Sequence, residues 1–160
     1  MILYINGDEH SAAAEAAVPY VNAEENFDLW WMGDTPNPEN VKVSFGNVLA
    51  HVLKARLTIE AKRGQTNEQI IAATKKFFGA NAIREQVVAI ISLPFLDHDQ
   101  FSEFGQYLKN IDVKHIIYPT SDYVEWLESK GFKPNANGYF DSAAHKAWAG
   151  NLIKPLTQIL

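Results

Sequence analysis

The residues best suited to chemistry stand together near the start of the chain, where Asp8, Glu9, His10 and Ser11 follow Gly7. A carboxylate can act as a general base or as a nucleophile, and an imidazole can act as a base for a neighbouring group. Glu9 follows the Gly-Asp pair directly and is therefore the first candidate for a catalytic role. Its structural alternative is a carboxylate in the first turn of a helix, where the helix dipole stabilises it by about 0.3–1 kcal/mol.

The neighbours of Glu9 have simpler interpretations. The Asp8 side chain is suited to capping the turn or the free N–H groups of a following helix. We expect His10 to pack or bond near the turn. Ser11 carries the adjacent hydroxyl, but it lies two residues further along a tight turn, which directs it elsewhere.

A second histidine, His145, lies four residues after Asp141 near the other end of the chain. Residues four apart share one face of a helix, and Asp141 is a suitable N-cap for a final helix. His145 is interpreted either as a buried histidine bonded to the opening turn or as a base that replaces a lost one. If the protein is an active enzyme, its catalytic candidates are Glu9, His10 and His145.

Two short stretches are dense in metal-ligating residue types, Asp8-Glu9-His10 and Asp97-His98-Asp99. Neither has the spacing of an established metal motif, so no metal site is predicted. Nothing in the sequence indicates a cofactor.

The opening residues are positioned by a predicted strand, Met1 to Ile5, and by a predicted helix in the alanine-rich stretch Ser11 to Val18. A strand that passes through Gly-Asp into a helix places its next residue at the mouth of an open α/β sheet. Ligands and nucleophiles gather there, outside the carboxyl ends of parallel strands.

The rest of the chain alternates between strand and helix patterns, which predicts a three-layer α/β/α sandwich. Its central parallel sheet would have about four or five strands, and residues 1–160 would form a single domain. Ser44 and Thr66 or Asn67 are candidate helix caps. The elements expected after the first helix are a helix in Val43–Leu57, a strand at Leu57–Ala61, a helix from Ile70 to Phe78, a strand at Glu85–Ser92, a helix from Phe101 to Ile111, a strand at Val113–Tyr118, a helix at Tyr123–Ser129, a loop at Gly131–Phe140 and a helix at Asp141–Leu160 broken near Pro155.

A long irregular segment, Pro19 to Asn40, contains Trp30 and Trp31 within a cluster of large apolar residues. The two tryptophans either pin this loop to the body of the protein or form a lid or partner-binding surface beside the sheet's mouth. They are the candidate interface, and the oligomeric state is left open.

The bulk composition excludes several classes of protein. The net charge of −5, from 14 basic and 19 acidic residues, disfavours nucleic-acid binding, which relies on clustered basic side chains. The chain has no cysteine, no basic leader and no apolar run of membrane-spanning length. The sequence therefore predicts a cytoplasmic protein that binds neither nucleic acid nor membrane.

The order of these turns resembles the SGNH (GDSL-like) hydrolase family, and in particular a small phage-encoded branch of it. The opening block of the family, a strand leading into Gly-Asp-Ser, corresponds to Gly7-Asp8-Glu9. The oxyanion-hole loop corresponds to Gly64–Asn67. The family's third block supplies an asparagine that is missing from Ser92-Leu93-Pro94-Phe95. The closing block before the last helix corresponds to Gly138-Tyr139-Phe140-Asp141 followed by Ala144-His145 and Trp148-Ala149.

The resemblance implies an SGNH-hydrolase-like, flavodoxin-like fold, but the catalytic triad is replaced. The positions of the nucleophilic serine, the histidine and the aspartate hold Glu9, Tyr139 and Ala136. Acyl transfer by a triad needs a hydroxyl, a base within hydrogen-bonding reach and a carboxylate that orients the base.

The sequence therefore predicts a catalytically degenerate, SGNH-hydrolase-like pseudoenzyme that binds a protein or a small ligand, as a phage accessory protein in the host cytoplasm. The alternative is an active esterase or hydrolase with a rewired site that uses Glu9 and a histidine. The expected ligand pocket, or former active site, is formed by Gly7, Asp8, Glu9, His10, Gly64, Asn67, Tyr139, Asp141 and His145.

Overall fold

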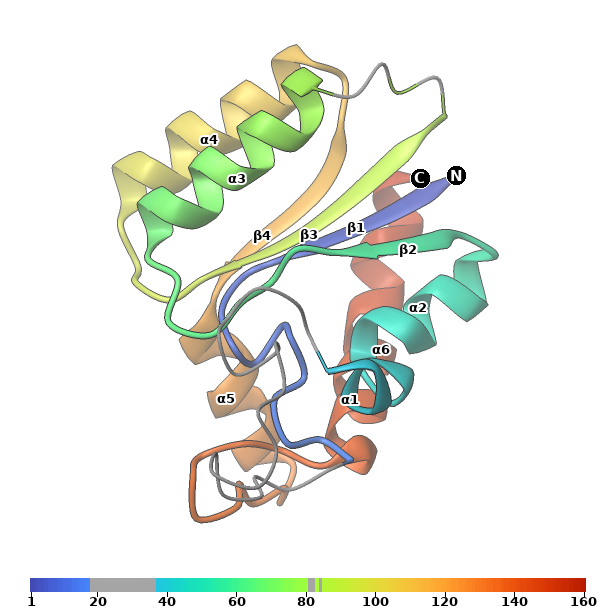
Figure 1. The fold of residues 1–160 in the computed structure, drawn as a ribbon, viewed down its shortest axis with the longest axis vertical. Helices are drawn as coiled ribbons and strands as arrows, with labels where there is room; N and C mark the ends of the chain where they lie inside the picture. Colours follow the sequence, from blue (N-terminus) through green and yellow to red (C-terminus); the bar gives the residue numbers. More distant parts are fainter. Residues whose placement is uncertain (18–36, 81–82, 84) are drawn as a thin grey trace.

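The computed structural model describes residues 1–17, 37–80, 83 and 85–160 (Figure 1). Within this part of the chain, four strands form one parallel sheet in the order β2-β1-β3-β4. The predicted alternation of strands and helices is confirmed. The elements are β1 (Ile2–Asn6), α1 (Pro38–Lys42), α2 (Phe45–Leu53), β2 (Arg56–Ile59), α3 (Asn67–Ala80), β3 (Val87–Leu93), α4 (His98–Asn110), β4 (Lys114–Pro119), α5 (Thr120–Ser129) and α6 (Ser142–Ile159).

Helices cover both faces of the sheet, which gives the three-layer α/β/α arrangement (Figure 1). Successive side chains of a strand point to opposite faces, so β1 and β3 contribute to two separate cores. Leu3 and Ile90 belong to the core beneath α2, α5 and α6. Tyr4 and Ile91 belong to the core beneath α3 and α4. All seven residues of β3 are buried, as its continuous apolar run predicts.

Helix boundaries follow from local capping chemistry. The Ser44 side chain accepts a hydrogen bond from Asn47 N at 3.0 Å, so the predicted cap of α2 is confirmed. The helix ends at Leu53 because Lys54 adopts a left-handed conformation, with φ of 52°. Just upstream, the short helix α1 was not predicted. Asn37 caps it through the N–H groups of residues 39 and 40.

The helix predicted from Ser11 to Val18 is wrong over its described residues, because residues 11–15 form turns and residues 16–17 form a bend. Ala13 and Glu15 have φ angles of 57° and 55°, which a right-handed helix does not allow. The hydrogen bonds here span unequal intervals, for example Ala13 N to His10 O and Ala14 N to Glu9 O. Alanine propensity is overridden because neighbouring loops bind both ends of this segment, as described below.

The break predicted near Pro155 is also wrong, since α6 continues from Ser142 to Ile159 with the proline inside it. Leu152 and Leu156 lie on either side of Pro155 and are both buried in the core beneath α6. We attribute the continuity to this packing, which offsets the backbone hydrogen bond that proline cannot donate.

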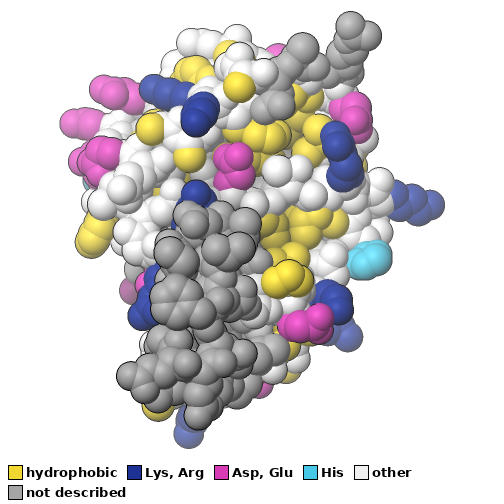
Figure 2. Space-filling view, in the orientation of Figure 1, with side chains coloured by type: hydrophobic (Ala, Val, Ile, Leu, Met, Phe, Trp, Pro, Cys, Tyr) yellow, Lys and Arg dark blue, Asp and Glu magenta, His cyan; other side chains and the backbone are white. Residues whose placement is uncertain are grey.

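Trp30 and Trp31, the predicted interface, lie outside the described residues. None of the described helices has the length and apolar character needed to cross a bilayer. On the face shown in Figure 2, basic and acidic side chains are interspersed rather than gathered by sign.

Candidate functional site

The turns that follow the four strands meet at the carboxyl end of the sheet, as the parallel topology requires. Side chains from the loop after β2, from the end of β3 and from the start of α5 contact the segment after β1. Gln65 Nε2 donates to Gly7 O at 2.8 Å, the hydroxyls of Ser11 and Ser92 share a hydrogen bond of 2.8 Å, and Thr120 Oγ1 donates to Asp8 at 2.7 Å. The chain order reverses between β1 and β3, the switch point where open α/β sheets bind ligands.

Gly7 fits between the other loops only because it lacks a side chain. A Cβ atom there would lie 2.2 Å from Ser92 Oγ, 2.6 Å from Ser11 Oγ and 2.9 Å from Ser11 Cβ. The glycine thus allows the close approach that joins β1's turn to the end of β3.

Asp8 is a buried carboxylate with two hydrogen-bond donors. His10 N donates to its Oδ1 atom at 3.1 Å, and Thr120 Oγ1 donates to Oδ2. Burial raises the pKa of Asp8, and the nearby His10 and the Thr120 hydrogen bond oppose that rise. Asp8 caps its own turn, in line with its sequence interpretation, and also ties that turn to the start of α5.

Glu9 points across the mouth of the sheet to the loop after β2. Its Oε2 atom accepts a hydrogen bond of 3.0 Å from Gly64 N. The carboxylate therefore uses the backbone N–H that the family resemblance assigns to an oxyanion hole. Since residues 11–17 are not helical, the predicted interaction of Glu9 with a helix dipole does not occur in the described structure.

His10 lies within a group of aromatic rings. Its ring centroid is 5.4 Å from that of Tyr123, 5.6 Å from Tyr139 and 6.4 Å from Phe140. These rings come from α5 and from the loop before α6. His10 thus packs near the turn as predicted, and its ring joins segments more than a hundred residues apart.

His145 is buried, with both ring nitrogens engaged. Phe45 N donates to Nδ1 at 3.3 Å, so the neutral ring carries its proton on Nε2, which lies 3.4 Å from the Tyr123 hydroxyl. Burial, together with the charge of His10, lowers the pKa of His145 to about 4. The predicted bond to the opening turn is wrong, because the partners of His145 belong to the start of α2 and to α5.

The loop before α6 closes over the opening segment. Tyr139 is buried and packs against Ala14, while Asn135 and Asn137 donate to the Glu15 carboxylate at 3.1–3.2 Å. Ala136, to which the resemblance assigns the aspartate position, is exposed. Asp141 caps α6 as predicted, since its Oδ1 atom accepts from Ala144 N at 3.0 Å.

Asn67, also assigned to the pocket by the sequence, instead has a structural role. It is buried at the start of α3, and its side chain bonds both backbone groups of Phe95. It therefore holds the loop after β3 and contacts neither Glu9 nor either histidine through a hydrogen bond.

Sequence reasoning missed Gln65, Ser92, Thr120 and Glu15. A search for hydrophilic residues at the carboxyl end of each predicted strand and in the few residues after it would have found the first three, because parallel strands bring those positions together. Glu15 gave no such signal, since its partners lie in an irregular loop.

The site combines hydrogen-bonding groups and aromatic rings, but its acidic and basic side chains are engaged with other parts of the protein. Among the described residues, no hydrogen bond joins Glu9 to a histidine. No group of three or more His, Asp or Glu side chains in this part of the chain is placed to hold a metal ion. Comparison with known proteins found no matching family model, curated protein or solved structure.

Proposed function

We propose that this chain is a catalytically degenerate, SGNH-hydrolase-like pseudoenzyme that acts by binding a protein or a small ligand. The observation that carries the proposal is the hydrogen bond between Gly64 N and the Glu9 carboxylate. A carboxylate at the nucleophile position occupies the N–H donor that would stabilise an oxyanion. Two parts of an acyl-transfer site are therefore hydrogen-bonded to each other, and the donor is not available to a substrate.

Two further features support loss of the triad. Tyr139 at the histidine position packs against His10 and Ala14, and burial raises the pKa of its hydroxyl, which makes it a poor base near neutral pH. His145 has both ring nitrogens occupied.

The fold is compatible with the resemblance. The strand order β2-β1-β3-β4 follows the first four positions of the flavodoxin-like order, and Glu9 lies at its switch point. A role as a phage accessory protein in the host cytoplasm is part of this proposal and is inferred from the family resemblance alone. The rewired esterase requires a contact of roughly 3 Å between Glu9 and a histidine, or one bridging water, and the hydrogen bonds of Glu9 and His145 give it no support.

The test is hydrolysis of short-chain p-nitrophenyl esters by the full chain. We expect no turnover above that of buffer, and no difference between the parent and Glu9→Ala. A His51→Ala variant, altered at an exposed histidine on α2, controls for hydrolysis by surface imidazole. Ester turnover that Glu9→Ala abolishes and His51→Ala retains would overturn the proposal.

A thermal-shift screen with acyl, sugar and nucleotide ligands then distinguishes binding of a small ligand from binding of a protein. A rise in Tm that depends on ligand concentration supports a small-molecule ligand. The shift should be reduced by a substitution within the site, such as Gln65→Ala, if the ligand binds at this end of the sheet.

A further inference from the structure

Two large apolar side chains project from the carboxyl end of the sheet. Phe95 and Leu96 follow β3 and are 67% and 58% exposed, the two highest values among large hydrophobic residues in the described chain. We call this pair the apolar tip. Isolated exposed apolar residues are ordinary, but two adjacent ones on a short loop form a compact contact surface.

A buried side chain holds the Phe95 backbone of the apolar tip in place. Asn67, 3% exposed, accepts from Phe95 N at 3.1 Å and donates to Phe95 O at 2.7 Å. Gln100 Oε1 accepts the second Asn67 amide proton at 2.8 Å. A loop fixed in this way loses little conformational entropy on association, and aromatic anchors of this kind dominate many interfaces.

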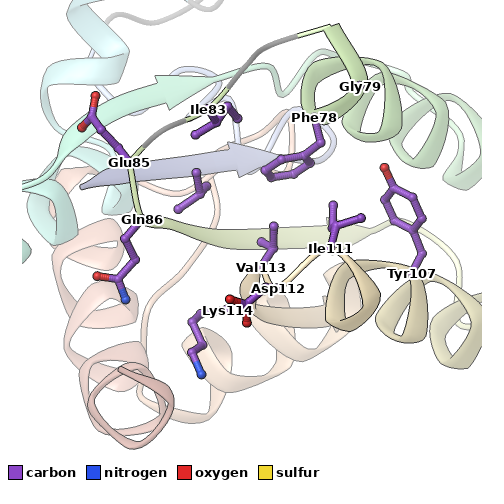
Figure 3. Close-up of a pocket in the computed structure, with 11 residues that line it drawn as sticks. Phe78, Gly79, Ile83, Glu85, Gln86, Tyr107, Ile111, Asp112, Val113 and Lys114 are labelled. Carbon is purple, nitrogen blue, oxygen red and sulfur yellow. The ribbon is translucent and has the colours of Figure 1, made fainter.

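The opposite end of the sheet carries a cavity of about 540 Å³, between the last turns of α3 and α4 (Figure 3). Its size is within the range of about 300–1,000 Å³ for sites that enclose small molecules, so it has room for two side chains. Its apolar wall is formed by Phe78, Ile83, Val87, Tyr107, Ile111 and Val113.

Acidic residues flank the tip, whereas the cavity is lined by both acidic and basic side chains. The tip is flanked in sequence by Asp97 and Asp99, and Gln100 links Glu68 of α3 to the same loop. Exposed Lys114 lines the cavity, and exposed Lys109 lines a smaller adjoining one.

Two acidic side chains, Glu85 and Asp112, also line the cavity and reduce its positive charge. The Glu85 carboxylate is engaged by the N-terminal ammonium at 3.1 Å and by Arg56 at 3.2 Å. Asp112 remains as the other acidic residue of the lining. Since Glu85 is paired, Lys109 and Lys114 outnumber Asp112 at the edge of the two cavities, and this edge is complementary to an acidic surface.

We propose that the apolar tip of one copy of this chain inserts into the cavity of a second copy. Val87 at the start of β3 lines the cavity, and the tip follows the end of the same strand, about 20 Å away. One molecule cannot satisfy both surfaces itself, so the contact is head-to-tail and joins copies into a ring or an open chain. This inference does not depend on whether the former active site binds a ligand.

The test is sedimentation equilibrium of the full chain over a wide concentration range. We expect the average mass to rise above the 18.0 kDa of one chain as concentration increases. Phe95→Ser combined with Leu96→Ser should weaken association at least tenfold. Val52→Ser is the matched control, because Val52 is 53% exposed on α2 and belongs to neither surface, and it should change association less than twofold.

A mixing experiment identifies the receiving surface. Ile111→Glu places a negative charge at the cavity, at a side chain that is 40% exposed and therefore tolerant of substitution. This variant retains the tip, and the Phe95→Ser/Leu96→Ser variant retains the cavity, so each should be monomeric alone and the mixture should form a closed 1:1 dimer. A monomeric parent at all concentrations, an unaffected tip variant, or a mixture without dimer would each overturn the proposal.

Discussion

At the carboxyl end of the sheet, Asn6, Asp8, Ser11, Ser92 and Thr120 are buried. Ser11 is hydrogen-bonded to Ser92, Thr120 donates to Asp8, and Asn6 accepts from Gly7 N. At the amino end, β1 and β3 begin with the buried apolar residues Ile2 and Val87, and buried Val113 directly precedes β4. Val87 and Val113 line an open cavity. Every buried side-chain N or O atom among the described residues has a hydrogen-bond partner. Substitutions at the polar end that change the shape of a side chain should therefore be destabilising, whereas the cavity at the apolar end can accommodate added atoms.

The largest expected effect comes from adding one methyl group at each end. Gly7→Ala should lower the free energy of unfolding by about 4 kcal/mol, since the new Cβ would overlap Ser11 and break the Ser11–Ser92 hydrogen bond. Gly79→Ala, in α3 beside the cavity, meets no atom within 4 Å and should instead gain up to about 1 kcal/mol of helix stability. Urea denaturation of both variants measures the difference, and similar values for the two would refute the contrast.

The second effect is a loss of stability in acid that depends on His145. The pKa of this histidine is lowered to about 4 in the folded protein, from 6.5 in an unfolded chain. Unfolding therefore takes up a proton as the pH falls from 6.5 towards 4, and stability decreases across that window. The shift is worth about 3 kcal/mol between pH 7 and pH 4.

His145→Gln is the matched variant, because its amide oxygen can still accept from Phe45 N. We expect denaturation curves of the parent to lose about 3 kcal/mol more than those of the variant between pH 7 and pH 4. Equal pH slopes for the two proteins would show that His145 is not held neutral.

Asp8 should give a smaller effect of opposite sign. Burial raises its pKa, so the folded protein holds the proton more tightly than the unfolded chain does. The contribution of Asp8 is thus greatest at low pH and is lost as the pH rises through its folded pKa. Asp8→Asn removes this cost and should stabilise the protein at pH 7.

The Asp8→Asn advantage should disappear below the unfolded pKa of about 3.9, where both side chains are neutral. Thr120→Val separates charge from hydrogen bonding, because it removes the donor to Asp8 and leaves the carboxyl group in place. The Thr120→Val variant should be destabilised at pH 7. If Asp8→Asn were also destabilised at pH 7, the hydrogen bonds of the Asp8 carboxylate would outweigh the cost of burying its charge, contrary to this expectation.

The sequence was a good guide to the sheet and a poorer one to the turns beside it. The buried run of β3 and the caps Ser44 and Asp141 depend on local pattern, and all three were predicted. The Ser11–Ala17 turns were not, because contacts with Ser92 and with a loop 120 residues away override the helix propensity of alanine.

The same distinction applies to the candidate site. The meeting of Glu9 with Gly64 was foreseeable in outline, because both follow adjacent parallel strands. The partners of His145 were not, since they depend on how α2, α5 and α6 pack together. The cavity likewise gave no sequence signal, because it is a space between helix ends rather than a pattern of residues.

The smallest effect concerns backbone strain, which both ends contain. Lys54 is an exposed residue with φ of 52° between α2 and β2, and Ala13 is a fully buried residue with φ of 57° in the opening segment. Lys54→Gly should raise the free energy of unfolding by about 0.5–1 kcal/mol, because glycine accepts this conformation without a steric penalty. Ala13→Gly relieves the same strain but also removes a buried methyl group worth about 0.8 kcal/mol, so we expect little net change. Urea denaturation that showed equal gains for both would mean that the Ala13 methyl contributes nothing to the packing at the carboxyl end, contrary to the tight fit inferred there.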